Sequence, residues 1–126
     1  MKKKFKVPIL LLLRLFLPLV PEKLELIMKN ADLSTAQNSK KGVYILEAVL
    51  VNGKHYWSHV NGAKSIWWVA QPKQWCIGST QYLGTPTSGL CFITDVPVPQ
   101  EATNWKYSKN KQWVNTTDLD IGTYAF

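Results

Sequence analysis

Two histidines are the first residues of this chain whose type and spacing could support chemistry. His55 and His59 lie four positions apart, so on a β-strand they share one face, with Trp57 between them. A zinc site needs a third or fourth ligand, and the sequence places none of the distant aspartates beside this pair. We therefore expect two solvent-facing histidines on a sheet surface and no metal site.

The acidic and nucleophilic residues form no pattern that is typical of an enzyme. Five carboxylates follow residue 42, and nothing in their spacing indicates the two flanking acids of a glycoside hydrolase. The chain has neither a glycine-rich phosphate loop nor a Gly-x-Ser-x-Gly nucleophile motif. We expect a protein that is not an enzyme and needs no cofactor. A small hydrolase or metal enzyme would require His55 and His59 to meet an acid in a cleft.

Cys76 and Cys91 are the only cysteines of the chain, one in each of two predicted strands. If these strands form a hairpin centred near Leu83-Gly84, the two sulfurs face each other and can form a disulfide. The alternative is a pair of buried free thiols that pack as small apolar residues. A secreted protein favours the disulfide, whereas a cytosolic one favours the thiols.

Tryptophan is unusually dense in the stretch "WWVAQPKQW", residues 67–75. Adjacent Trp67 and Trp68 point to opposite faces of a strand, because side chains alternate along it. We expect Trp57, Trp75 and one of the adjacent pair to be structural, and the other of the pair to contribute to an exposed aromatic surface. The predicted ligand-binding residues are Trp67, Trp68, Tyr56, Tyr82 and Trp105. Such a surface suits sugar rings or an apolar partner protein.

From residue 42 onward, short β runs alternate with turn sequences. "VNG" occurs at 51–53 and again at 60–62, and Asn-Gly between apolar runs favours tight hairpins. The segment "DVPVPQEA" cannot be a central strand, because its prolines lack backbone donors. The pattern predicts an antiparallel meander with strands near 43–51, 54–60, 64–70, 74–80 and 89–95.

A frame of nine residues occurs twice, as "WWVAQPKQW" at 67–75 and "WKYSKNKQW" at 105–113. Each copy consists of a Trp-bearing strand, a polar turn, and Lys-Gln-Trp on the way back. We expect two hairpins, with Trp67 beside Trp75 in the first and Trp105 beside Trp113 in the second.

The N-terminal segment differs in composition from the rest of the chain. Residues 1–21 combine a basic start with an apolar run that is too short for a transmembrane helix. They predict a secretory signal, or a leader that stays on a membrane surface, although Arg14 interrupts the apolar run. A third interpretation is that the working protein begins at Met28. We expect residues 22–41 to form a short helix followed by a polar linker.

Size and charge narrow the class of protein further. A chain of 126 residues supports one domain, and 46% hydrophobic residues exclude global disorder. The net charge is +7, but the first 36 residues carry +4 of it. A nucleic-acid-binding domain concentrates basic charge on its folded part, so we do not expect nucleic acid as the partner.

Asn115-Thr116-Thr117 is the only Asn-x-Ser/Thr glycosylation sequence of the chain. It follows the last predicted strand and should be accessible. Asn115 is therefore a glycosylation site if the protein is secreted.

The order "GVY…VNGKHYW…IWW…KQWCIG…P…NWKY…KQW" over residues 42–114 resembles a short Trp- and Gly-rich β module. Modules of that kind recur in extracellular multidomain proteins of aquatic invertebrates and in some protist proteins. The resemblance implies a secreted or surface-attached adhesion or recognition module.

Taken together, these patterns predict an all-β domain at 42–126, an antiparallel meander curling into a barrel or compact sandwich. We expect a secreted, non-catalytic module that binds carbohydrate or an extracellular protein. A membrane-associated structural protein held by an uncleaved leader is the alternative.

Overall fold

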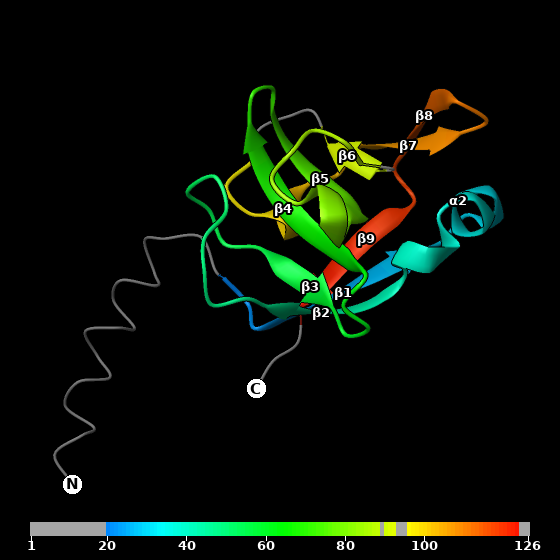
Figure 1. Cartoon of the computed structure of the whole chain (residues 1–126). Helices are drawn as coiled ribbons and strands as arrows, with labels where there is room; N and C mark the ends of the chain where they lie inside the picture. Colours follow the sequence, from blue (N-terminus) through cyan, green and yellow to red (C-terminus); the bar gives the residue numbers. More distant parts are fainter. Residues whose placement is uncertain (1–19, 89, 93–95, 124–126) are drawn as a thin grey trace, which may run out of the picture.

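A single antiparallel sheet dominates the computed structural model, which describes residues 20–88, 90–92 and 96–123 (Figure 1). One short helix, α2 (Ala31–Ala36), and the 3-10 turns η2 (Asn38–Lys40), η3 (Thr80–Tyr82) and η4 (Pro99–Glu101) accompany it. The strands are β1 (Lys23–Met28), β2 (Gly42–Leu46), β3 (Trp57–His59), β4 (Lys64–Ala70), β5 (Lys73–Ser79), β6 (Leu90–Phe92), β7 (Trp105–Lys109), β8 (Gln112–Thr116) and β9 (Leu119–Thr123). The all-β prediction is confirmed.

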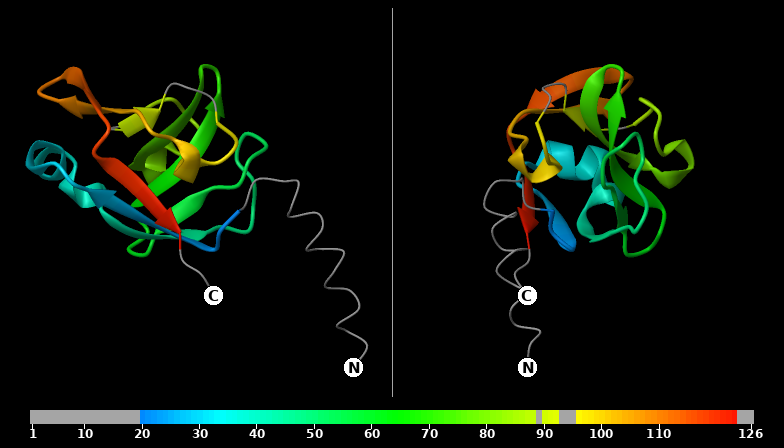
Figure 2. Two further views of the ribbon diagram at one scale, coloured as in Figure 1. Left: turned by 180° about the vertical axis from the view of Figure 1, so that it is seen from behind. Right: turned by 90° about the vertical axis from the view of Figure 1, so that its left-hand side faces the viewer.

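The strands form a meander that curls until its last strand meets its first. Their order is β8-β7-β6-β5-β4-β3-β2-β1-β9. Only Thr117 and Asp118 separate β8, which pairs with β7, from β9, which pairs with β1. One bent C-terminal segment therefore joins both ends of the meander, and the sheet takes the shape of an open barrel (Figure 2).

The main core lies inside the curled sheet. Trp57 and Trp75 pack there with ring centroids 6.2 Å apart, and Trp105 is equally buried. Aliphatic side chains from β1, α2, β4, β5 and β9 complete the cluster, namely Leu24, Leu26, Leu33, Ile66, Ile77 and Leu119. Burial of large aromatic and aliphatic side chains on this scale is the main source of stability for so small a domain.

A second, smaller cluster covers the outer face of β4 and β5. It consists of Trp67, Val69 and Cys76, with Tyr56 and Leu83 packed against it. A Cβ added to Gly78 would meet the backbone of Ser88 at 3.0 Å, so the loop after β5 lies directly on the sheet here. This loop is the second layer that buries Trp67 on the outer face, while Trp68 packs against the inner cluster and stays partly exposed.

The prediction of a helix within residues 22–33 is wrong for its first half. Residues 23–28 form strand β1, in which Leu24 and Leu26 point into the core and Lys23 and Glu25 alternate with them. The apolar period of two in "KLEL" favours a strand, and pairing with β2 and β9 on both sides stabilises it. The helix begins later, at Ala31, where the Asn30 side chain accepts hydrogen bonds from two backbone amides.

The predicted strands near 64–70 and 74–80 agree with β4 and β5 to within one residue. The strand predicted at 43–51 ends at Leu46, because residues 47–56 form a loop around the tight turn at Asn52-Gly53, where both residues have positive φ. The strand predicted at 54–60 shortens to Trp57–His59. Of the strand predicted at 89–95, the described part forms β6.

Both hairpins of the repeated frame exist, but the predicted tryptophan pairs are wrong. Trp68, not Trp67, lies opposite Trp75, and Trp113 lies opposite Ser108 rather than Trp105. A two-residue turn brings residues of odd separation face to face, whereas the tryptophans of each frame are eight residues apart. The two members of each pair therefore occupy opposite faces of the sheet.

Gly42 is expected to be a position that tolerates no side chain. Its φ is +120°, and an added Cβ would lie 2.8 Å from Nε2 of His59, which hydrogen-bonds the Lys41 carbonyl. Gly42→Ala should lower the free energy of unfolding by about 2–4 kcal/mol in urea denaturation. Gly62→Ala is the control, because Gly62 also has positive φ but open space around it, and should cost only about 1 kcal/mol. Equal losses would contradict the contact with His59.

Lys40 should make stability depend on pH. Burial and, secondarily, repulsion by Lys64 lower the pKa of Lys40 from 10.5 to about 8. The unfolded chain keeps this proton up to pH 10.5, so native stability rises with pH between about 8 and 10.5. Lys40→Met should therefore raise the free energy of unfolding by about 1 kcal/mol at neutral pH, after discounting for solvent screening. This gain in the free energy of unfolding should vanish above pH 10.5, the pKa of Lys40 in the unfolded chain. Urea denaturation at several pH values measures the gain, and a gain that does not change with pH would contradict this mechanism.

Candidate functional site

The five predicted ligand-binding residues do not share one surface. Trp67 and Trp105 are 0% and 1% exposed and belong to the core. Trp68 packs against the cluster inside the barrel, whereas Tyr56 packs against the outer cluster. Tyr82, in η3, is 43% exposed. Only Trp68, Tyr56 and Tyr82 are therefore available to a ligand, and Trp68 and Tyr56 lie on opposite faces of the sheet.

Three buried indole N–H groups are used to hold the chain together. Trp57 donates to the carbonyl of Pro21, Trp67 to that of Thr85 and Trp75 to that of Val96, each at 2.9 Å. All three acceptors lie outside the strands. These tryptophans fasten the segments that cross or cover the sheet, so their density has a structural cause.

The two histidines do not form one site. His59 accepts a hydrogen bond at Nδ1 from the Asn61 amide, so its Nε2–H donates to the Lys41 carbonyl at 2.7 Å. Its ring also packs edge-on against Tyr44. His55 is exposed in the loop before β3. In the described part of the chain, no group of three His, Cys, Asp or Glu side chains could hold a metal ion.

The cysteines lie where the sequence predicted them, on adjacent strands. Cys76 on β5 and Cys91 on β6 are directly opposite in the register. Cys76 is a buried free thiol in this structure, and burial raises its pKa although Gln74 and Ser88 hydrogen-bond to it. The disulfide stays a prediction.

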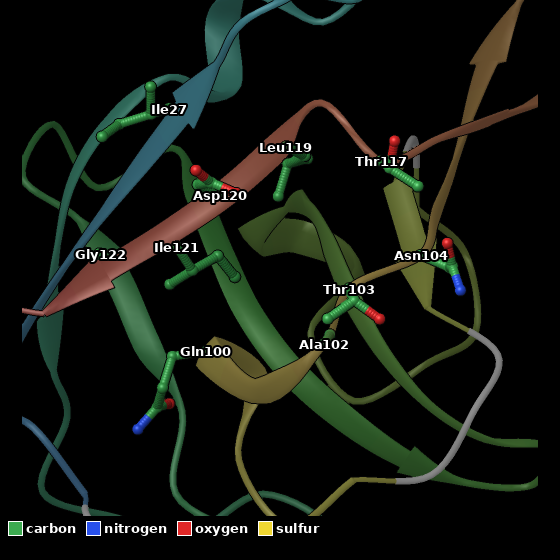
Figure 3. Close-up of a pocket in the computed structure, with 10 residues that line it drawn as sticks. All are labelled: Ile27, Gln100, Ala102, Thr103, Asn104, Thr117, Leu119, Asp120, Ile121 and Gly122. Atoms are coloured by element: carbon green, nitrogen blue, oxygen red, sulfur yellow. The ribbon is translucent and has the colours of Figure 1, made fainter.

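A groove of about 650 Å³ lies beside β9 (Figure 3). One wall is β9 itself, with Leu119 and Ile121. The other wall is the segment from η4 to the start of β7, with Gln100, Thr103 and Asn104. Figure 3 shows Leu119 and Ile121 on β9 opposite Ala102 and Thr103, while the Gln100 side chain extends away from β9.

The groove exists because two strands separate. The ladder between β7 and β8 ends at the pair Trp105–Thr116. The same register would next bring Asn104 opposite Thr117, but the chain turns away there to pair with β1. Bent segments of this kind let a curled sheet close without continuous pairing, and they leave an opening in its wall.

The groove combines neutral hydrogen-bonding groups with aliphatic side chains. Among the described lining residues, Asp120 is the only carboxylate, and it pairs with Lys29 at 2.5 Å. This pairing raises the pKa of Lys29. The remaining polar side chains are amides and hydroxyls, namely Gln100, Thr103, Asn104 and Thr117. They can bind the hydroxyl or amide groups of a ligand.

Sequence reasoning missed this groove entirely. Its lining comes from β1, β9 and the segment 100–104, which are far apart along the chain, and no local pattern connects them. It also missed Trp113, which is 53% exposed on the hairpin that projects beside α2 (Figure 1). The repeated frame does contain a signal for Trp113. With a two-residue turn, Trp113 and the buried Trp105 lie on opposite faces of the sheet.

The leader predicted at residues 1–21 lies almost entirely outside the described residues. No helix among the described residues is long and apolar enough to cross a membrane. Asn115 is exposed on edge strand β8, and Thr117, the third residue of its glycosylation triplet, lines the groove.

Two tryptophan variants should separate structural from surface roles. Trp67→Ala removes a fully buried indole and its hydrogen bond to Thr85, and should lower the free energy of unfolding by about 3–5 kcal/mol. Trp113→Ala should cost less than about 1 kcal/mol, because its indole already contacts water. Urea denaturation followed by circular dichroism measures both values. A large loss for Trp113→Ala would mean that its ring is part of the core.

Comparison with known proteins does not identify a family for this chain. No protein-family model, no curated protein and no solved structure matches the chain.

Proposed function

We propose that this protein is a non-catalytic recognition module that works outside the cell and binds a neutral oligosaccharide in the groove beside β9. The observation that carries this proposal is the lining of the groove, which combines amide and hydroxyl side chains with aliphatic ones. The proposal moves the ligand away from the aromatic surface that the sequence predicted, since two of its five residues are buried.

The lining matches the chemistry of a sugar chain. Hydroxyl groups of a sugar both donate and accept hydrogen bonds, and so do amide and hydroxyl side chains. Ile27, which is 41% exposed, and Ile121 offer apolar contact to the C–H faces of the ring. No aromatic ring is among the described residues that line the groove. Its contacts with a sugar are therefore hydrogen bonds and aliphatic packing, and we expect modest affinity.

An extracellular location rests on three features of the chain. The basic and apolar residues 1–21 resemble a secretory leader. The acceptor Asn115 is exposed, and Cys76 and Cys91 are directly opposite in the register of β5 and β6. Residues directly opposite in an antiparallel pair have Cα separations that a disulfide can span.

A partner protein is the second candidate ligand, and one observation favours it. Trp113 leaves about half of its surface in water on a hairpin that projects from the sheet (Figure 2). Exposed tryptophans are frequent anchors of protein interfaces. In this case the binding residue would be Trp113, and the groove would have no part in recognition.

Removal of one amide tests the groove. Asn104→Ala deletes a hydrogen-bonding group of the groove, and should weaken binding to the best ligand on an array of neutral oligosaccharides by about tenfold. Asn104 is chosen over Thr117, because Thr117 also belongs to the glycosylation triplet. Isothermal titration calorimetry with the selected oligosaccharide measures the change.

Gln112→Ala is the matched control, since Gln112 is an exposed amide on β8 outside the groove. Binding should be unchanged in that variant. If no oligosaccharide binds, or if Asn104→Ala binds as well as the wild type, the groove is not the site. Loss of binding in Trp113→Ala alone would favour the partner protein.

Intact mass after expression through a eukaryotic secretory route tests the location and the disulfide together. We expect protein in the medium, shortened at its N-terminus, that gains about 2 Da on reduction. The bond closes a loop of about 15 residues and should contribute about 3 kcal/mol to stability. Cys76→Ser should abolish the mass change.

Full-length protein that stays in cells with free thiols would contradict the secreted form. A membrane-associated structural protein, held by an uncleaved leader, would then be the better description of the chain. Partition of the wild type between membrane and soluble fractions, compared with a variant that lacks residues 1–19, would separate an anchor from a segment without a membrane role.

A further inference from the structure

A second hollow lies at the mouth of the barrel and shares no lining residue with the groove. It has a volume of about 250 Å³. Trp57 and Trp75 from the core form its floor, Pro97 and Val98 form one side, and Lys54 and His55 stand at its rim. Mouths of barrels are frequent sites for small ligands. We call this hollow the mouth pocket.

The floor of the mouth pocket offers no hydrogen bond to a ligand. The indole N–H of Trp57 already donates to Pro21, and that of Trp75 donates to Val96. An indole has a single donor and no acceptor. Both indoles are nearly buried, each 1% exposed, so the accessible apolar lining beside them comes from Val20 and Pro97.

The rim of the mouth pocket carries positive charge. The Lys54 ammonium lies 4.9 Å from the centre of the Trp68 ring, and Trp68 is directly opposite Trp75 on the next strand. The tight turn at Asn52-Gly53 precedes Lys54, and the Asn52 side chain donates to the carbonyls of Trp68 and Gly84. Lys54 thus stands on a loop that is fastened to β4. No carboxylate is among the described residues that line the mouth pocket.

From the largely apolar described lining of the mouth pocket and the Lys54 ammonium beside it, we infer that the mouth pocket binds a small amphipathic anion. The ligand has an apolar body of about one ring, which packs on Val20 and Pro97 beside the buried indoles, and a carboxylate or sulfonate that pairs with the Lys54 ammonium. The volume is slightly below that of sites for drug-sized ligands. This inference is independent of the proposed binding of oligosaccharides in the groove.

Two probes with one carbon skeleton test the charge requirement. 4-Phenylbutyrate carries the carboxylate, and 4-phenyl-1-butanol is its neutral counterpart. Titration of the full chain with each is followed by the indole N–H signals in ¹⁵N–¹H correlation spectra. We expect the signals of Trp57 and Trp75 to shift, while that of Trp113, on the projecting hairpin, stays in place. The carboxylate should bind about tenfold more tightly than the alcohol.

Variants of Lys54 assign that difference to one side chain. Lys54→Met keeps an apolar stem and should reduce the ratio of the affinities for 4-phenylbutyrate and 4-phenyl-1-butanol to less than about twofold. Lys54→Arg retains the charge and should preserve the tenfold ratio of the wild type. Lys73→Met is the control, because Lys73 is an exposed lysine outside the mouth pocket. All variants should give the wild-type dispersion of amide signals, which verifies their fold.

Several results would overturn the inference. Shifts spread over all indole signals would indicate non-specific binding, and absence of any shift at millimolar probe would mean that the mouth pocket is closed. Equal affinity for the acid and the alcohol would exclude Lys54 as an anchor. If the mouth pocket fails and the groove still binds oligosaccharides, the proposed function stands without it.

Discussion

A buried indole must find an acceptor for its N–H group, and this requirement organises the molecule. Three tryptophans inside or against the sheet donate to carbonyls of Pro21, Thr85 and Val96. Each acceptor belongs to a segment without strand structure, so each bond fastens a loop to the barrel. Because an unsatisfied buried donor costs free energy, the loops cannot leave without exposing the rings. The same bonds leave the mouth pocket with an apolar floor.

The bend between β8 and β9 is the second constraint. It allows one continuous segment to pair with β7 at its start and with β1 at its end. The segment 102–104, which precedes β7, does not continue the β7–β8 pairing alongside β9. The wall of the barrel therefore opens, and the groove forms between this segment and β9. The candidate oligosaccharide site is therefore a consequence of how the meander closes. Its lining side chains add the hydrogen-bonding chemistry.

Local patterns predicted most of the strands but not the sites. Alternation and Asn-Gly turns located β4 and β5 closely, because those signals act between near neighbours. Residues 23–28 were assigned to a helix, although "KLEL" alternates, because partners for β1 come from residues 42–45 and 119–123. The predicted aromatic surface includes Trp67 and Trp105 beside Trp68, Tyr56 and Tyr82, because local patterns in a short meander indicate no second layer. The loop over Gly78 supplies that layer for Trp67.

The sequence by itself determined the all-β class, the two Trp-bearing hairpins and the opposite orientation of Trp67 and Trp68, since all of these follow from side-chain alternation and turn chemistry. It also brought Cys76 and Cys91 onto adjacent strands. Tertiary structure decided which tryptophans lost contact with water, where the barrel stayed open, and that Lys54 would stand over Trp68. Those outcomes depend on contacts between residues far apart in the chain, and the geometry of a closing sheet sets such contacts rather than any local pattern.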